Sequence, residues 1–177
     1  GPYHMEINYK AFTNGNGPLV IAEAKPNSAP TYPVLWSHIA ERERTMSFDG
    51  DSEGIPLKGA TSKEQEIINK KVADVWTTAT HCHFNRDFRF NSQSTGMQFT
   101  LRRTIGGRAW LSVKLSSAEQ EKALVLWANT SMGLLLHWWH ANKPQPGRGS
   151  IGKSALHSLP ILDVSALAPK QVAAAVK

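Results

Sequence analysis

The sequence contains little cysteine and no long apolar run. Cys82 is the only cysteine among the 177 residues, so an internal disulfide is excluded and a reducing, cytoplasmic environment is expected. No apolar stretch reaches the length of about 20 residues that a membrane-spanning helix needs, and the first residues lack the pattern of a signal peptide. We therefore expect a globular domain that makes no membrane contact.

Acidic residues are scarce in two segments of a chain whose net charge is +6. Residues 1–79 carry eight Lys or Arg and ten Asp or Glu, whereas residues 80–115 carry six basic residues against Asp87 alone. Residues 143–162 add three basic residues and no acid. Because this excess is local and led by arginine, it favours a surface for a polyanion over general solubility. For any single arginine, an ordinary solvated position is the alternative.

Groups that form catalytic centres are also few. Cys82 has no activating arrangement that the sequence reveals. Two histidine pairs have metal-like spacing, but no second cysteine completes a zinc site, and core or surface positions fit these histidines better: His81 with His83, and His137 with His140. We expect no catalytic residue, no metal and no cofactor in this chain.

Residues 147–154 match the phosphate-loop pattern G-x-x-x-x-G-K-[ST] in full. The context does not suit a nucleotide-hydrolysing enzyme, because two prolines precede the loop and Pro160 interrupts the helix that should follow it. The loop amides and Lys153 can still hold a nucleic-acid phosphate. Residues 48–59 are rich in Asp and Gly but lack the closing Glu of a calcium loop, so a solvated loop is expected there.

A long helical pattern begins at Ser117, whose spacing to Gln120 is that of a capping box. Leu and Trp residues occur on all of its faces, so we expect the core to be built around this helix. Poor helix formers at residues 129–133 predict a kink or two helices end to end. Three tryptophans are assigned to the core: Trp127, Trp138 and Trp139.

A second helix is expected at residues 61–79, where Ser62 repeats the capping-box spacing and apolar residues line one face. Strands are expected at residues 19–22, at residues 34–39 and in the alternating pattern of residues 80–115. The predicted fold class is α+β. Antiparallel strands pack on a long Trp- and Leu-rich helix, or on a kinked helix pair, and one amphipathic helix is added.

The last two strands of this region are expected to form a hairpin with a three-residue turn near Gly106. The preferred register pairs apolar residues on one face: Leu101 with Leu111, and Phe99 with Val113. Arg102 would then lie across from Trp110, where a guanidinium can stack over an indole.

Several segments resemble one known family. Residues 124–139 contain Ala-Asn-Thr-Ser, and residues 145–163 form a Gly-bearing loop that leads to Leu-Pro-Ile-Leu. Residues 33–39 and 88–110 are similar to the entry segment and the middle of the same kind of domain. The family is the target-recognition domain of bacterial adenine-specific DNA methyltransferases and fused restriction-modification enzymes, of the TaqI-like specificity type.

The resemblance implies a domain at residues 31–165 that reads a short site in double-stranded DNA. A methyltransferase catalytic domain elsewhere in the parent chain would act on a flipped adenine. The family's catalytic Asn-Pro-Pro-Tyr and its cofactor Gly motif are absent, so this chain is expected to be non-catalytic. Around the domain we expect a tag remnant at residues 1–4, an irregular lead-in or linker at 5–30 and a truncated helical tail at 166–177.

The candidate nucleic-acid surface follows from charge and side-chain chemistry. Contacts to the DNA backbone are expected from Lys143, Arg148, Ser150 and Lys153. Candidates for base edges are Asn91, Gln93, Arg102, Arg103, Arg108 and Gln145. The surface is completed by Arg86, Arg89 and Ser154.

Two other functions stay open. A protein-interaction or scaffold module would dock its Trp-rich helix onto a methyltransferase or nuclease partner. That function predicts an exposed apolar patch around Trp138 and Trp139 together with dispersed arginines. A nucleotide-binding enzyme comes third, through the phosphate-loop match.

Overall fold

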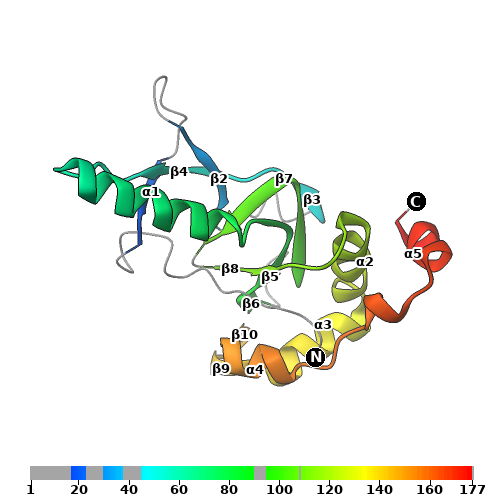
Figure 1. Ribbon diagram of the computed structural model, residues 1–177. Coiled ribbons are helices and arrows are strands. Elements are labelled where there is room, and N and C mark those ends of the chain that lie inside the picture. The colour runs from blue at the N-terminus through cyan, green and yellow to red at the C-terminus, as the bar shows by residue number, and fades with distance from the viewer. Residues whose placement is uncertain (1–16, 23–29, 38–44, 90–94, 108, 177) are drawn as a thin grey trace.

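The computed structural model describes residues 17–22, 30–37, 45–89, 95–107 and 109–176, without the side chain of Lys153. The predicted α+β class is confirmed, because helices and two separate sheets are both present (Figure 1). No helix in the described part of the chain is long and apolar enough to cross a membrane.

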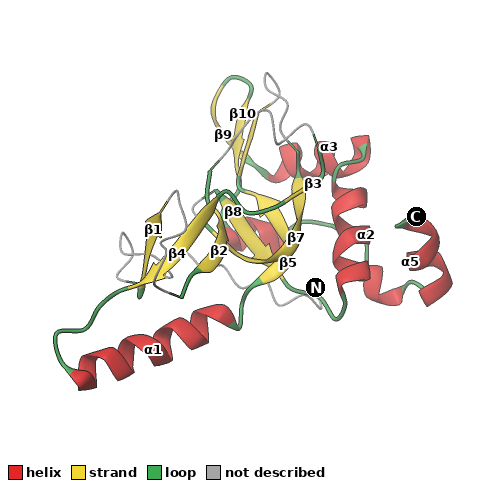
Figure 2. Cartoon of the chain, turned by 90° about the horizontal axis from the view of Figure 1, so that it is seen from above, coloured by secondary structure: helices red, strands yellow, loops and turns green. Residues whose placement is uncertain are grey.

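The large sheet has the strand order β1-β4-β2-β7-β5-β8, with β3 also paired to β7. Its strands are β1 (Leu19–Ala22), β2 (Tyr32–Leu35), β3 (Ser47–Phe48), β4 (Ser52–Pro56), β5 (Thr80–Asn85), β7 (Met97–Gly106) and β8 (Trp110–Val113). The small sheet has the order β6-β10-β9, with β6 (Asp87–Arg89), β9 (Asn142–Gln145) and β10 (Arg148–Ser150). In both whole-chain views the small sheet lies beside α3, away from α1 (Figures 1 and 2).

The first three of the five helices in the described chain begin at a side-chain cap, whereas in the last two the N-cap side chain makes no capping hydrogen bond. The five helices are α1 (Ser62–Trp76), α2 (Ala118–Ala128), α3 (Ser131–His140), α4 (Lys153–Ser158) and α5 (Pro169–Ala175), with a 3-10 turn at Val164–Ala166. Ser117 caps α2 as predicted, because its side chain accepts a hydrogen bond from the amide of Gln120. The cap of α1 is Thr61, one residue before the predicted one, and it accepts from the amide of Glu64.

The predicted break in the long helix is confirmed between α2 and α3. Asn129 fixes this break, because its Oδ1 accepts from the amide of Gly96 at 2.7 Å and its Nδ2 donates to the carbonyl of Met97 at 2.8 Å. Thr130 then caps α3 by accepting from the amide of Gly133. Thr130 thus starts the new helix, while Asn129 ties the break to the start of β7.

The predicted loop at residues 48–59 is wrong, because β4 lies there, between β1 and β2. Gly54 is buried in this strand, and a Cβ atom at this position would lie 3.3 Å from the Leu19 side chain and 3.4 Å from the Val34 side chain. A glycine therefore leaves room for side chains of the two flanking strands, β1 and β2, to pack over β4. Tertiary pairing has overridden a composition that is typical of loops.

The predicted hairpin of β7 with β8 is also wrong, because β5 lies between them. Cys82 pairs with Phe99 on one side and with Val113 on the other. Phe99 and Val113, predicted to pair with each other, therefore lie in one row across the sheet but are separated by β5. The residues of β5 from position 82 to position 85 are all buried, as expected for an inner strand whose two faces are both covered. Trp110 is buried and donates from Nε1 to the carbonyl of Ser37, so the predicted contact with Arg102 is absent.

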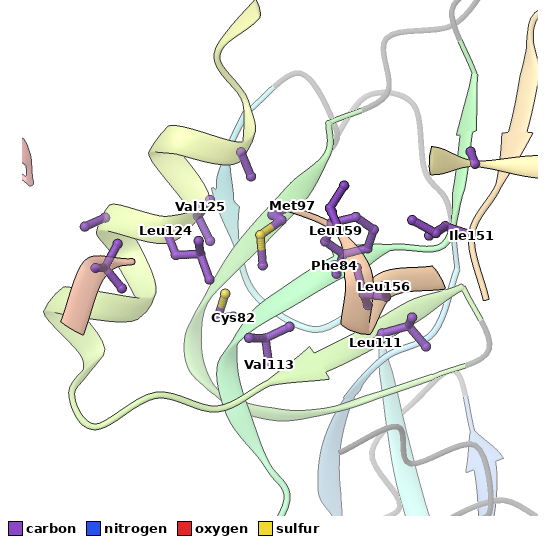
Figure 3. Close-up of a cluster of buried hydrophobic side chains, with 14 of the residues drawn as sticks. Cys82, Phe84, Met97, Leu111, Val113, Leu124, Val125, Ile151, Leu156 and Leu159 are labelled. Carbon is purple, nitrogen blue, oxygen red and sulfur yellow. The ribbon is translucent and has the colours of Figure 1, made fainter. Parts of the chain in front are cut away.

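The main core lies between the large sheet and the C-terminal helices (Figure 3). Leu124 and Val125 of α2 and Leu156 of α4 meet β5, β7 and β8 in this core. Val172 of α5 belongs to the same cluster, so the tail of the described chain packs on α2 rather than standing apart.

The expectation of a helix surrounded on all sides holds for α2 but is wrong for α3. Four apolar residues of α2 are buried, whereas only Gly133 and His137 of α3 are. Trp138 is half-buried, and Trp139, predicted to belong to the core, is 79% exposed. The prediction failed because α3 packs by only one side, at the edge of the fold. Apolar residues occur on all faces of α3, so its sequence does not reveal which side is buried.

Candidate nucleic-acid interface

The small sheet joins two segments that lie far apart in the sequence. Its register places Arg148 opposite Arg89 on β6 and opposite Gln145 on β9. Directly opposed residues of antiparallel strands project from the same face, with Cβ atoms about 5 Å apart. Two guanidinium groups and one amide therefore form a row across the outer face, which we call the arginine row: Arg89, Arg148 and Gln145.

The inner face of the small sheet is apolar and packs on α3. Phe88 pairs with Gly149 in the register and is buried. The ring of Phe88 lies 5.2 Å from the ring of His137. A Cβ atom on Gly149 would lie 2.9 Å from the Cβ of Ala141 and 3.1 Å from the ring of Trp138, so only glycine fits without a shift. This packing fixes which face of the sheet is turned outward.

A tight turn joins β9 to β10. Pro146 and Gly147 are the two residues between these strands, and Gly147 has a φ of 72°. Proline followed by a glycine with positive φ is the signature of a type II turn. All four residues of β9 are exposed. The hairpin is thus a ribbon with an accessible edge, and it extends from the body in Figure 2.

The charges on this sheet are almost all of one sign. Four cations lie on or beside it, against the carboxylate of Asp87: Arg86, Arg89, Lys143 and Arg148. Among the described residues no carboxylate forms an ion pair with Arg89 or Arg148. The Nε of Arg148 is buried and has no hydrogen-bond partner in the described part of the chain. Like charges placed opposite each other destabilise a sheet, so this arrangement is suited to an external anion.

Contacts within the fold position Arg86 and Lys143. The amide of Arg86 donates to Ala109, and its carbonyl accepts from Ile151, so this residue links the two sheets. The Nζ of Lys143 donates to the carbonyl of Ala141 at 3.2 Å and lies 5.3 Å from the ring centre of Trp138. Its charge therefore sits at the C-terminal end of α3, where a helix dipole favours a cation.

Arg102 and Arg103 do not lie with the small sheet. Thr104, next to Arg103, pairs with Thr80 at the start of β5, whereas the small sheet follows the other end of that strand. The six steps from Thr80 to Arg86 span roughly 20 Å of extended chain. These two predicted base-reading arginines are therefore on a different part of the surface.

Both of these arginines also have partners within the chain. The Nε of Arg102 forms an ion pair with Asp49 at 3.1 Å. Arg103 donates twice to the carbonyl of Ala79 and lies over the ring of Trp76, with its Cζ 5.9 Å from the ring centre. The cation–π contact predicted for Arg102 is thus made by its neighbour with another tryptophan.

The other predicted residues divide into two groups. Ser150 lies in the small sheet opposite Asp87, and Ser154 is exposed on α4. Three of the predicted residues lie outside the described part of the chain: Asn91, Gln93 and Arg108. The side chain of Lys153 is not described either.

The helix α4, which follows the phosphate-loop pattern, has only six residues, as expected from Pro160. A nucleotide-hydrolysing site has a long helix at this place.

The buried titratable groups fit a structural role. Burial raises the pKa of the Cys82 thiol well above its usual value, and the nearby Glu121 carboxylate adds to the rise, so a thiolate nucleophile is disfavoured. The described residues contain no cluster of three or more metal-binding side chains. Desolvation lowers the pKa of His83 to about 3 and that of His137 to about 4, which keeps both rings neutral.

Glu121 is a buried carboxylate that no sequence pattern marks. Its oxygens accept from the hydroxyl of Thr80 at 2.7 Å, from the amide of His81 at 3.1 Å and from the amide of Leu115 at 3.1 Å. These bonds tie α2 to the start of β5 and to the end of β8. The carboxylate is therefore part of the scaffold and not of a surface site.

Comparison with protein-family models, with curated proteins and with solved structures finds no match to this chain. The functional interpretation accordingly depends on the geometry of the small sheet and on the motif resemblance found in the sequence.

Proposed function

We propose that this chain is a non-catalytic domain that binds double-stranded DNA through the outer face of its small sheet. The arginine row is the observation on which this proposal depends, because folding brings Arg89 and Arg148 together without a described acidic partner. Phosphate is one of the two groups, with carboxylate, whose geometry matches the forked guanidinium of arginine. Double-stranded DNA presents phosphates at regular spacing along both strands.

The shape of the small sheet supports DNA as the polyanion. The major groove admits a two-stranded β-ribbon, and several DNA-binding proteins place strands there. The exposed hairpin of β9 and β10 is such a ribbon. In this proposal Arg86, Lys143 and the arginine pair contact phosphates and set the register. Gln145 is within the same row and carries the amide that reads adenine in the major groove.

The proposal extends to the parent protein through the sequence resemblance alone. A target-recognition domain supplies DNA contacts while another domain performs methyl transfer on a flipped base. On that basis we propose that the chain is the sequence-recognition part of a larger DNA methyltransferase or restriction-modification protein. No cofactor is assigned to the domain itself.

Titration of a labelled duplex with the purified domain at two salt concentrations tests the proposal. Four cations that reach phosphates predict a slope of log affinity against log salt of roughly −4. Fluorescence anisotropy at about 50 mM and about 200 mM salt measures this slope. Binding that does not change with salt, or no binding at the lower concentration, would contradict the proposal.

A second candidate is a protein-interaction module that docks a methyltransferase or nuclease partner. The observation in its favour is the exposed face of α3, where Trp139 is 79% exposed, together with the separate position of Arg102. A protein-interaction module does not account for the position of Arg89 opposite Arg148 in the small sheet, so we place this function second. Its distinguishing result is a domain without duplex affinity that binds a catalytic subunit of the same system.

A further inference from the structure

The strand β9 contains a bulge, which decides the faces from which its side chains project. Gln145 of β9 pairs with Arg148 of β10. Asn142 pairs with Ser150, and the register shifts between the two pairs, so three steps along β9 match two steps along β10. In a regular strand, residues three apart project from opposite faces. Because each residue shares a face with its partner on β10, the bulge brings Asn142 onto the same outer face as Gln145.

The two residues between these amides are consistent with the bulge and show its direction. Pro144 has no amide hydrogen to donate to a neighbouring strand, and strands accommodate proline at edges and bulges. The Nζ of Lys143 donates to the carbonyl of Ala141 and lies over the ring of Trp138, so this side chain is turned towards α3. Its neighbour Asn142 is turned the other way and is exposed.

The side chains of Asn142 and Gln145 are available to a ligand. Both are exposed, and neither forms a hydrogen bond within the described part of the chain. They lie on the edge strand of the small sheet, whereas the guanidinium groups of the arginine row lie on the other two strands.

Asn142 belongs to a second row on the outer face, with Ser150 and Asp87. This row contains no cation, and Asp87 lies at the end of it opposite Asn142. A carboxylate repels phosphate, so the second row is not suited to the DNA backbone. Base edges in the major groove instead offer amino groups and acceptor nitrogens, which an amide can bind.

We propose that Asn142 is a second base-reading residue, which reads an adenine two base-pair steps from the adenine read by Gln145. This inference rests on the proposed binding of duplex DNA and adds a feature of the bound sequence to it. The amide of Asn or Gln makes paired hydrogen bonds to adenine in the major groove. The two rows are two strand steps of about 3.4 Å apart, and successive base pairs are also about 3.4 Å apart. A ribbon that lies along the groove therefore requires two A·T pairs with one base pair between them.

Selection from a library of duplexes with a random central segment tests the inference on the full chain. The wild type should enrich duplexes that contain two A·T pairs separated by one base pair. Asn142→Ala should lose the preference at one of these pairs and keep it at the other, and Gln145→Ala should do the reverse. The lost discrimination should be roughly tenfold for each amide. The slope of log affinity against log salt should not change, because an amide carries no charge.

Asn142→Asp provides a result that a folding defect cannot imitate. A carboxylate accepts a hydrogen bond from the N4 amino group of cytosine, so this variant should prefer a C·G pair where the wild type prefers A·T. Asn69→Ala is the matched control, because it removes an exposed amide on α1, outside the small sheet, and should leave the preference unchanged. Circular dichroism should show the same melting temperature for these variants, since both positions are exposed.

The outcomes separate this inference from the function on which it rests. Salt-dependent binding without a preference for the two A·T pairs would overturn the inference and leave the proposed DNA binding intact. A uniform loss of affinity over all sequences in Asn142→Ala would do the same, because it would assign this amide to the backbone. A wild-type chain that binds no duplex at about 50 mM salt would overturn the proposed function and the inference together.

Discussion

Arg89 and Arg148 lie directly opposite each other across β6 and β10, although they come from segments far apart in the sequence. The next pair in the same register, Phe88 with Gly149, faces inward and packs on α3. One apolar contact thereby holds two cations side by side on the outer face. The function we propose requires this link between core packing and surface charge, and the link can be tested by changes on either face.

Gly149→Ala should loosen the small sheet without removing a charge. The added Cβ would lie 2.9 Å from the Cβ of Ala141, so the hairpin must shift away from α3. We expect a loss of about 1–3 kcal/mol in the free energy of unfolding, together with weaker duplex binding. Urea denaturation and anisotropy titration measure the two effects.

Gly152→Ala is the matched control for this change. Position 152 has a φ of −87°, and a Cβ there would meet no atom within 4 Å. Stability should fall by less than about 1 kcal/mol, because position 152 is the N-cap of α4 and glycine is preferred to alanine there. Equal effects at positions 149 and 152 would show that the close approach to α3 is not what holds the hairpin.

His137 should make stability depend on pH in one direction. The pKa of the buried ring is lowered from 6.5 to about 4 by desolvation. Between these values the unfolded chain binds more protons than the folded one, so stability is full above pH 6.5 and falls as the pH drops towards 4. The maximal loss is on the order of 3 kcal/mol. His83, whose pKa is lowered to about 3, adds a loss of the same sign.

His137→Phe should remove this part of the pH dependence. Both ring nitrogens of His137 are buried without a partner in the described chain, and the ring lines a small cavity with Phe84 and Met97. A phenyl ring should therefore stabilise the fold by about 1 kcal/mol at neutral pH. His157→Phe, at an exposed position, is the control and should leave the slope unchanged. Unfolding curves at several pH values between 4 and 7 are the measurement, and an unaltered slope in the His137 variant would refute the assignment.

Asn129→Ala should destabilise the junction of α2 and α3. The change removes the acceptor for the amide of Gly96 and the donor to the carbonyl of Met97. Leaving these backbone groups unpaired should cost about 2–4 kcal/mol. Asn129→Asp keeps the acceptor but not the donor, so its free energy of unfolding should lie between those of the wild type and Asn129→Ala. Asn69→Ala on the exposed side of α1 is the control and should cost about 0.5 kcal/mol or less. Urea denaturation should show the largest loss for Asn129→Ala, a smaller one for Asn129→Asp and the smallest for Asn69→Ala.

Features set by neighbouring residues could be predicted from the sequence. The caps at Ser117 and at Thr130, where α2 and α3 begin, depend on side chains that bond to an amide three residues further on, so the local pattern contains the required information. The α+β class follows from the same local periods. The start of α1 was placed within one residue for the same reason.

Features set by distant residues could not be predicted. No local pattern shows that β5 lies between β7 and β8. The apolar residues Phe99 and Val113 match each other in the predicted hairpin as well as they match Cys82 in the observed sheet. The charge pattern indicated two basic segments, and both contribute to the small sheet. It did not indicate that Arg102 would pair with Asp49 while Arg89 would meet Arg148, since each pairing is decided by strand order.

The most direct measurement is duplex affinity, with its salt dependence, for the double variant Arg89→Ala/Arg148→Ala beside the control Arg102→Ala. The double variant should bind roughly tenfold or more weakly, and its slope of log affinity against log salt should be smaller by about 2. The control loses an exposed arginine that is already paired with Asp49, so it should bind like the wild type. A double variant with unchanged affinity and slope, or a control that is equally impaired, would contradict the assignment of the small sheet as the DNA-binding surface.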